Sequence, residues 1–394
     1  MVNSSLLIYE ASSRTDAVIT AVYDDGVRLT NYLVNNGAGY AAGATSIAVD
    51  AGVAGSSIPT NSKIIFDSHR KIYTVSSGIS GATGTITITP ALTTAISDND
   101  HVEIINFYTG SGTSAGQLQN TVSAGAWSSY NGYFRLAATP SKQITCDVMS
   151  VSAYVQHSAG DVFATIAGEL GITVDSASVT TLNTVGVIGI NMPDTTPSKE
   201  LFDSIARSVG GFYYYLGSTL YFSLFDAPSG SPVATIEEYQ ILSIERDATG
   251  LGSNGLPINE VKAQYNKIDT IQTTVAASTP LYRTELLKNE YRDTSVNDAD
   301  VLTRHPLSPS LTIQTRLRKK ADALAVINRL LGLCKVRRDV ISVTAFFSQM
   351  PSIALGNTIV IKHSRYSYSA GRSFVIVGYE ADMKRKKITL RLFG

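Results

Sequence analysis

Short stretches in which hydrophobic and polar residues alternate make up most of the chain, and this is the pattern of half-buried β-strands. Early strands are predicted at 6–9 and 17–23. The second is followed by Asp25 and Gly26 and then by apolar residues at 27–29. Because an Asp-Gly pair accepts the positive φ angles of a two-residue turn, a β-hairpin is predicted here.

Residues 41–105 carry shorter strands separated by Gly, Pro, Asn and Asp. Five strands are predicted in this stretch, at 46–49, 63–66, 71–75, 85–88 and 101–105. Their spacing suggests a small barrel or sandwich, inserted into a first β-domain that is made of 1–40 and 106–150. A hairpin turned at Pro140 is also predicted, from strands at 132–136 and 143–148.

The spacing of apolar residues then changes to that of amphipathic helices. Helices are predicted over 162–170, with Gly171 as the glycine that ends it, and from Ser198 to Gly210. Aromatic strands follow at 212–216 and 219–224, joined by the two-residue turn Gly217-Ser218. We interpret 151–245 as an α+β module of two helices and a hairpin.

The last domain is expected to span 246–394. Its longest helical pattern covers 316–334, and residues 280–309 are interpreted as a long polar loop or arm. Strands are predicted at 259–265, 311–315, 340–347, 358–362, 374–379 and 387–392. The fold class is therefore mainly β, α+β overall, with several small barrels or sandwiches, a helix-helix-hairpin module and one longer C-terminal helix.

Charge is scarce and unevenly placed. Charged residues are 16% of the chain, where about 25% is usual for a soluble domain. The 32 Lys+Arg and 32 Asp+Glu cancel, but residues 311–394 hold 16 basic and 4 acidic residues, a net of +12, which leaves −12 for 1–310. This asymmetry suggests an acidic partner or a neighbouring copy of the same chain.

Three basic clusters account for much of the positive charge and are candidate contact residues. They could meet phosphates as point charges, although a solvated face or an interface with acidic protein explains them better than sequence-specific DNA binding. The residues are Arg316, Arg318, Lys319 and Lys320, then Arg337 and Arg338, and finally Lys384, Arg385, Lys386 and Lys387.

No catalytic, metal or cofactor site is predicted. Cys146 and Cys334 are the two cysteines, and the histidines never fall at metal-binding spacing. Neither a signal peptide nor an apolar run of spanning length is expected. Three carboxylate pairs could serve acid-base chemistry, but their turn-like surroundings favour structural roles: Asp24 with Asp25, Asp98 with Asp100, and Asp298 with Asp300.

Several stretches carry a family resemblance. The first β-domain contains residues 21–30, which include Val22-Tyr23-Asp24-Asp25-Gly26, together with 132–140 and 144–148. The later part contains Thr196-Pro197-Ser198, residues 330–340, Leu355-Gly356-Asn357 and the final strand at 388–394. In this order they resemble the hub proteins of long-tailed, siphophage-type bacteriophage tail tips and baseplates and of gene-transfer agents.

The resemblance implies a structural virion protein rather than an enzyme, assembled in the bacterial host cytoplasm and located at the virion tail tip. Such a tail hub is a homotrimer that joins the sixfold tail tube to a threefold tip or fibre and surrounds the channel for genome ejection into the host. Its implied partners are a distal tail ring protein, the tape-measure protein and a central fibre or tip protein, with DNA only in transit. The ten basic residues would then face a neighbouring subunit or the lumen.

Two departures and two alternatives accompany this interpretation. Family members usually carry a further N-terminal domain, so a separate chain is expected to supply it unless the tail tip does without it. Related hubs can hold an iron-sulfur cluster or a hydrolase module, and the residues for neither are present. The alternatives are a tail-associated cell-wall hydrolase and a receptor- or carbohydrate-binding module, the latter motivated by Tyr213, Tyr214, Tyr215, Tyr366 and Tyr368.

Overall fold

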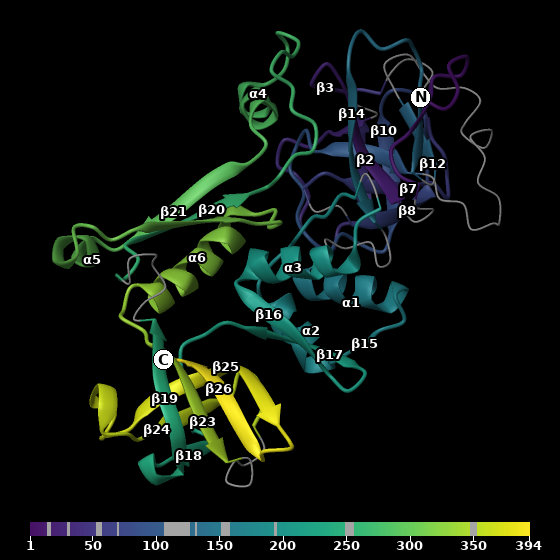
Figure 1. Cartoon of the computed structure of the whole chain (residues 1–394). Helices are drawn as coiled ribbons and strands as arrows, with labels where there is room; N and C mark the ends of the chain where they lie inside the picture. Colours follow the sequence, from purple (N-terminus) through teal and green to yellow (C-terminus); the bar gives the residue numbers. More distant parts are fainter. Residues whose placement is uncertain are drawn as a thin grey trace. The chain divides into compact units, whose positions relative to one another are not determined.

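The computed structural model contains two compact units, Met1–Gln156 with Thr270–Glu290, and His157–Asp269 with Tyr291–Gly394 (Figure 1). Strands outnumber helices in the part that is described, which confirms the predicted fold class. The finer division into four domains stays a prediction. The structure describes residues 1–13, 17–29, 32–52, 57–68, 71–105, 127–130, 132–150, 158–192, 195–248, 256–346 and 353–394.

The predicted N-terminal hairpin is confirmed in the first unit. β2 (Ala17–Asp24) and β3 (Val27–Leu29) pair antiparallel around Asp25 and Gly26, whose φ angles are 50° and 84°. Positive φ at both central residues is the geometry of a two-residue turn that suits twisted strands. β14 (Ile144–Ser150) pairs with the other side of β2 and completes a three-stranded sheet.

The predicted hairpin between 132–136 and 143–148 is wrong. β13 pairs with β1 and β12, whereas β14 pairs with β2. The alternation of apolar and polar residues identified both strands but not their pairing partners. Gly132, with a φ of 79°, turns the chain from β12 directly into β13. The strands of this second small sheet are β1 (Ile8–Glu10), β13 (Tyr133–Leu136) and β12 (Trp127–Tyr130).

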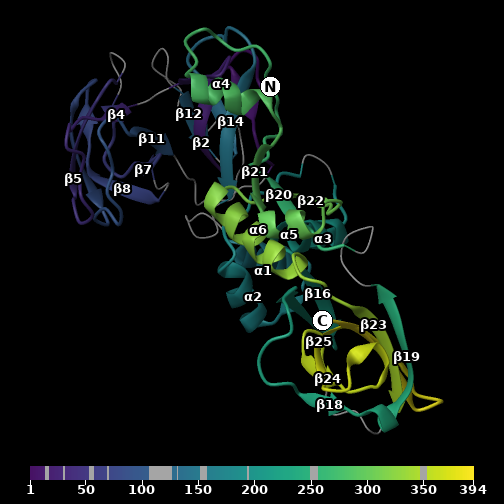
Figure 2. The same cartoon turned by 90° about the vertical axis from the view of Figure 1, so that its left-hand side faces the viewer.

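Residues 32–105 form a closed six-stranded barrel, which confirms the barrel expected within this stretch (Figure 2). Alternate side chains point inward and form one buried core. β4 closes the barrel between β5 and β11 although it precedes residue 41. In order around the barrel, the strands are β10 (Gly84–Thr89), β5 (Ser46–Asp50), β4 (Tyr32–Val34), β11 (His101–Ile105), β7 (Lys63–Phe66) and β8 (Ile72–Ser77), with β6 (Ser57–Ile58) and β9 (Ile79–Ser80) as an additional pair.

The segment Thr270–Glu290 belongs to the first unit although the chain on both sides of it belongs to the second. It contains α4 (Leu281–Lys288) and is called the clasp below. The backbone N–H of Ala276 donates to the carbonyl of Asp25 at 3.0 Å, and the Arg283 Nε donates to the carbonyl of Gly26 at 3.2 Å. The clasp therefore holds the turn of the β2–β3 hairpin.

The second unit begins with the predicted helices and hairpin. α1 (Ala159–Glu169) and α3 (Ser198–Val209) pack on a sheet of β16 (Gly211–Leu216), β17 (Thr219–Leu224) and β15 (Thr173–Val174). Phe163, Phe202 and Phe222 meet in their common core. The additional helix α2 (Ser176–Asn183) was not predicted, because its residues are mostly small and polar.

The interpretation of 280–309 as a loop is wrong. This stretch holds α4, then β21 (Arg292–Asn297) and α5 (Ala299–Arg304). β21 pairs antiparallel with β20 (Glu260–Tyr265), and β22 (Ser310–Gln314) pairs in parallel with the other side of β20. Alternate residues of β21 are exposed and polar, so the strand gives little hydrophobic signal.

The predicted helix 316–334 is observed as α6 (Lys320–Cys334), which begins four residues later. Residues 316–318 are instead extended: the carbonyl of Arg316 accepts from the N–H of Gly189 at 3.0 Å, and the N–H of Arg318 donates to Val187 at 2.9 Å. Leu317 is fully buried between them, so its apolar character comes from this pairing and not from a helix face.

A six-stranded sheet completes the second unit and includes the C-terminal strands expected from alternation. Its interior forms a separate hydrophobic core. In spatial order the strands are β18 (Ala234–Ile236), β24 (Thr358–Ile361), β25 (Arg372–Asp382), β26 (Lys387–Phe393), β23 (Val340–Phe346) and β19 (Ile241–Ala248), with short 3₁₀ turns at Glu238–Gln240 and Arg365–Ser367. Among the helices in the described ranges, none has the length and apolar character needed to cross a membrane.

Candidate functional site

The ten predicted contact residues occupy three separate places in the second unit. α6 separates the first group from the second by 15 residues, which is about 22 Å along a helix. β26 separates the second group from the third by roughly 20 Å of strand. The groups lie at the start of α6 (Arg316, Arg318, Lys319, Lys320), before β23 (Arg337, Arg338) and at the turn between β25 and β26 (Lys384 to Lys387).

The first group divides into anchored and solvent-facing members. The Arg318 guanidinium donates to the carbonyl of Lys267 at 3.2 Å, which anchors it to the end of β20. Lys319 and Lys320 are exposed where α6 begins. The start of a helix disfavours cations, and Asp322 in the first turn supplies the opposite charge there.

The second group is part of an internal network. Asp339, the next residue, is 1% exposed and accepts from the Tyr368 hydroxyl at 2.7 Å and from Arg372 at 2.9 Å. The Arg337 Nε lies 3.8 Å from the second oxygen of Asp339. Burial, followed by the nearby charge of Arg372, lowers the pKa of Arg338.

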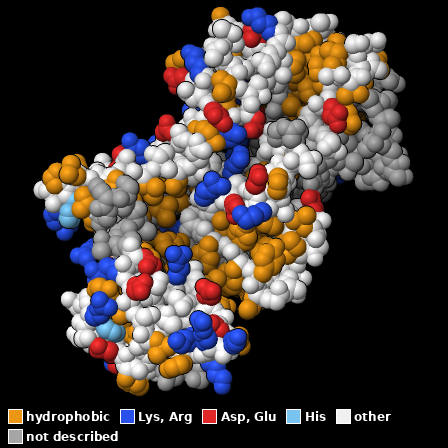
Figure 3. Space-filling view, viewed as in Figure 1, with side chains coloured by type: hydrophobic (Ala, Val, Ile, Leu, Met, Phe, Trp, Pro, Cys, Tyr) orange, Lys and Arg blue, Asp and Glu red, His pale blue; other side chains and the backbone are white. Residues whose placement is uncertain are grey.

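The third group is the most exposed one. Lys384, Arg385 and Lys386 all lie at the turn between β25 and β26, beside an exposed Met383. Asp382 holds the turn by accepting from the N–H of Arg385 at 2.9 Å. Figure 3 shows Lys and Arg side chains gathered over this end of the sheet, so this turn is a candidate docking element for an acidic surface.

The three carboxylate pairs have structural partners. Asp24 accepts from the backbone N–H groups of Ser141 and Lys142 at 2.8 and 3.1 Å. Asp98 accepts from the N–H of Asn36 at 2.8 Å, and Asp298 caps α5. The structural interpretation of the pairs is therefore consistent with the contacts. Among the residues that the structure describes, no group of three potential ligands is placed to hold a metal ion.

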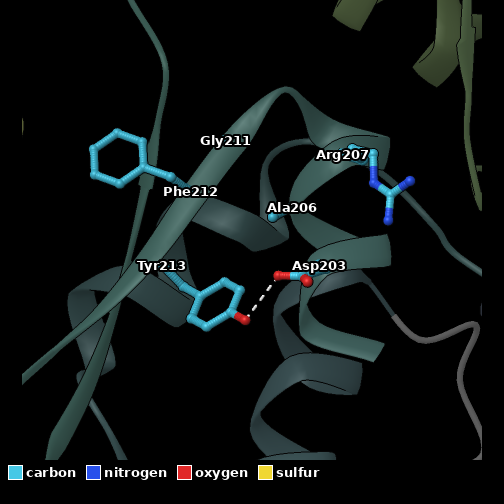
Figure 4. Close-up of a pocket in the computed structure, with 6 residues that line it drawn as sticks. All are labelled: Asp203, Ala206, Arg207, Gly211, Phe212 and Tyr213. Carbon is cyan, nitrogen blue, oxygen red and sulfur yellow. Dashed lines mark hydrogen bonds between the residues drawn. The ribbon is translucent and has the colours of Figure 1, made fainter. Parts of the chain in front are cut away.

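An open pocket of about 460 Å³ lies between α3 and β16 (Figure 4). The Tyr213 hydroxyl donates to Asp203 at 2.8 Å across it, and Lys199 donates to the same carboxylate at 3.0 Å. These hydrogen bonds, Tyr213 first, lower the pKa of Asp203, whereas burial and the Asp203 contact raise the pKa of Tyr213 to about 12. Neither group is poised to exchange a proton near pH 7.

A second hollow of about 390 Å³ is lined by uncharged residues. Tyr214 stacks on Tyr221 with ring centroids 5.4 Å apart, and Tyr215 and Tyr379 are about half exposed. Two of the tyrosines noted in the sequence are thus brought together here, while Tyr366 and Tyr368 lie elsewhere, near Asp339. The lining residues are Tyr214, Tyr215, Leu216, Ile353, Ala354, Leu355, Gly378 and Tyr379.

Sequence reasoning did not single out Arg246, Arg372 or Tyr379. Arg246 reaches Asp339 because β19 pairs with β23 in a register that sets Arg246 opposite Ile341. Arg372 reaches it from the start of β25. In the sequence Arg246 and Arg372 lie in two separate strands, and only strand pairing brings them together. Tyr379 lies apart from them, in the second hollow.

The chain has neighbours among solved structures. A tail protein from Neisseria meningitidis MC58 is 10% identical, with 96% of each chain covered and a TM-score of 0.38. A chain of a native gene transfer agent virion is 11% identical, with 98% of this chain and 85% of that chain covered and a TM-score of 0.41. The 43 kDa tail protein of prophage MuSo2 from Shewanella oneidensis is 9% identical, with 96% and 94% covered and a TM-score of 0.37.

Their descriptions name a tail protein, a chain of a gene transfer agent virion and a prophage tail protein. No protein-family model matches the chain, and no curated protein matches it.

Proposed function

We propose that the chain is a structural subunit of a phage tail and forms a homotrimeric hub at the tail tip. The observation that carries the proposal is the assembly of the motif stretches. Residues 22–29 and 144–148, far apart in the sequence, are adjacent strands of one sheet. Asp24 also bonds to the backbone just before β14. The motif residues therefore build a scaffold rather than a reaction centre.

Surface character supports assembly from several copies. Large apolar side chains that are at least 72% exposed include Tyr239, Leu281, Tyr282 and Leu307. Exposed groups of this kind are commonly covered in a protein interface. The net charge of +12 in 311–394 and −12 in 1–310 lets one copy present a basic surface to an acidic surface of the next.

In this role the trimer joins the tail tube to a threefold tip or fibre and surrounds the channel through which the genome leaves. Its partners are a distal ring protein, the tape-measure protein and a fibre or tip protein. The exposed Lys384, Arg385 and Lys386 turn would meet a neighbouring subunit or the DNA in transit.

The mass of the purified protein in solution tests the proposal. Light scattering should give three times 42.0 kDa at low salt. If the basic turn contacts a neighbour, moderate salt and the double variant Lys384→Glu/Lys386→Glu should both loosen the trimer, whereas exchange of Lys199 for Glu should not. A monomer at every salt and protein concentration, also after addition of ring protein, would contradict the hub role.

The same protein should lack hydrolytic activity. One carboxylate of each predicted pair is held by hydrogen bonds in a turn or at a helix start. We therefore expect none of the three pairs to serve as the acid and base of a glycoside hydrolase. Turbidity of a cell-wall suspension should stay constant on addition of the protein. Clearing that disappears on changing Asp203 or another single carboxylate would instead establish the hydrolase alternative.

Glycan recognition is a second candidate function, favoured by the uncharged hollow beside Tyr215 and Tyr379. Exposed aromatic rings with hydroxyl tips suit sugar rings, which present both apolar faces and hydroxyls. Binding to host cell-wall glycans should be lost in Tyr379→Ala and kept in Tyr239→Ala, a matched control on a tyrosine that is 84% exposed. Equal binding by both variants would remove this candidate.

A further inference from the structure

Arginine side chains from three segments of the second unit meet at one buried carboxylate. Around Asp339, the Arg372 Nη1 lies 2.9 Å and the Arg246 Nη2 lies 3.6 Å from one oxygen. The Arg337 Nε lies 3.8 Å from the other oxygen. We call Arg246, Arg337, Arg338 and Arg372 the arginine cluster. It lies at the end of the six-stranded sheet where Figure 1 marks the C-terminus.

The cluster carries more positive charge than its surroundings neutralise. Within the described part of the chain, Asp339 is the one acidic side chain within ion-pair distance of Arg246, Arg337 and Arg372. Gly394, the last residue, supplies one further oxygen, which accepts from the Arg372 Nη2 at 2.9 Å. Even if that oxygen is counted as a second negative charge, the four guanidiniums keep a surplus of two positive charges. Arg338 is half-buried, and burial, followed by the charge of Arg372, lowers its pKa. Like charges at such a position repel unless an anion joins them.

Hydrogen-bond donors in the cluster also lack acceptors. The Nε atoms of Arg246 and Arg338 are buried and have no hydrogen-bond partner in the structure. A buried donor without an acceptor is unfavourable, and an oxyanion supplies several acceptor oxygens at once. The donors and the surplus charge thus point to the same kind of ligand.

The cluster is held in place and reached from solvent. The Arg246 guanidinium lies 4.3 Å from the centroid of the Tyr366 ring, and Arg372 lies 5.5 Å from that of Tyr368. Stacking of this kind fixes the plane of a guanidinium. The two terminal nitrogens of Arg372 already donate to Asp339 and to the Gly394 oxygen, each at 2.9 Å, whereas the Nε atoms of Arg246 and Arg338 stay without a partner. The side chains of Arg337, Arg372 and Arg246 are 60%, 34% and 22% exposed.

We propose that the arginine cluster is a binding site for a phosphate group. The guanidinium fork matches two oxygens of a phosphate, and a doubly charged anion offsets the surplus of positive charge. The phosphate would come from free inorganic phosphate or from the backbone of a nucleic acid. The site does not depend on the role of the chain as a tail subunit.

Calorimetric titration of the full chain with inorganic phosphate, at ionic strength matched with chloride, tests the site. We expect saturable binding with one phosphate per chain. Arg338→Gln should weaken it by about 10-fold or more, as expected for the loss of one charge-assisted fork. Lys384→Gln/Lys386→Gln, which removes two cations at the opposite end of β26, should leave the affinity unchanged.

Asp339→Asn gives a readout that a purely structural role would not produce. It keeps the shape of the side chain but removes the competing negative charge, so phosphate should bind more tightly. If Arg338→Gln fails to fold, Arg337→Gln at a largely exposed position takes its place and should weaken binding several-fold. Absence of saturable heat, or equal weakening in the lysine control, would overturn the proposal.

Competition identifies the source of the phosphate. Short duplex DNA that displaces inorganic phosphate, with loss of this effect in Arg338→Gln, would support the site with a nucleic acid as its ligand. A phosphate isotherm that DNA does not change would support a site for free phosphate.

Discussion

The guanidinium carbon of Arg283 lies 3.3 Å from the centroid of the Tyr23 ring. Arg283 comes from the clasp and Tyr23 from β2, so the contact joins segments that are more than two hundred residues apart in sequence. The same side chain donates from Nε to the carbonyl of Gly26 at 3.2 Å. One arginine therefore holds both a strand and the turn that follows it.

Removing this side chain should destabilise the first unit. Arg283→Ala loses a cation–π contact and leaves a carbonyl without its donor, which together should lower the free energy of unfolding by about 1–3 kcal/mol. Trp127 is the single tryptophan, is buried in this unit and donates to the carbonyl of Leu29. Urea unfolding followed by its fluorescence measures the loss, and Lys288→Ala on the exposed side of α4 is the control.

The Gly26 turn offers a second test of the clasp. A Cβ at Gly26 would lie 3.0 Å from the Val275 side chain, whereas one at Gly43 would meet nothing within 4 Å. Both glycines have positive φ, so Gly26→Ala and Gly43→Ala share a backbone cost of about 1–2 kcal/mol. Gly26→Ala should lower the free energy of unfolding by about 1 kcal/mol more than Gly43→Ala, because the clasp must move to make room for the methyl group. If urea unfolding gave the same loss for both variants, the clasp would accommodate the methyl group without an energetic cost.

Local chemistry made much of this fold predictable. Asp25-Gly26 and Gly217 mark turns that need positive φ, and the apolar spacing around Phe163 and Ile205 marks buried helix faces. Residues 280–309 gave no such signal, because Leu281 and Tyr282 of α4 are exposed. The predicted start of the helix at residue 316 was wrong, because Leu317 is buried by a β-bridge with Ile188, which is distant in sequence, and not by a helix face.

The candidate sites were less predictable than the fold. The sequence shows Arg337 and Arg338 as a basic pair, but their environment depends on Asp339, Arg246 and Arg372. Those residues meet through the register of β19 and β23 and through the start of β25. Register is set by which face of each strand is buried along its whole length, so no local pattern encodes this contact.

The first unit should lose stability as the solution becomes acidic. Burial, followed by the charge of Arg28, lowers the pKa of His101 from 6.5 to about 4. The unfolded chain therefore binds a proton that the folded unit rejects, and the stabilisation present above pH 6.5 is lost as the pH falls towards 4. Urea unfolding at pH 7 and pH 5 measures this loss. His101→Asn should reduce the change in the free energy of unfolding between pH 7 and pH 5. If that change stayed the same in the variant, groups other than His101 would cause it.

Arg28 provides a comparison of a buried and an exposed ion pair on one guanidinium. Its Nη2 lies 3.1 Å from Glu103, which is fully buried, and its Nη1 lies 2.9 Å from Asp67, whose side chain is 34% exposed. Glu103→Gln leaves a half-buried charge without its inner partner and should lower the free energy of unfolding by about 3 kcal/mol or more. Asp67→Asn should cost below about 1 kcal/mol, because water can replace the outer partner.

The two variants differ from the parent protein by one charge each, and both exchanges preserve side-chain shape. Urea unfolding at pH 7 separates the buried contribution from the exposed one. Because β11 carries Glu103 and β3 carries Arg28, the loss in Glu103→Gln should accompany faster hydrogen exchange along β3 and β11. Similar losses in both variants would mean that the ion pair acts through total charge and that burial of Glu103 adds nothing.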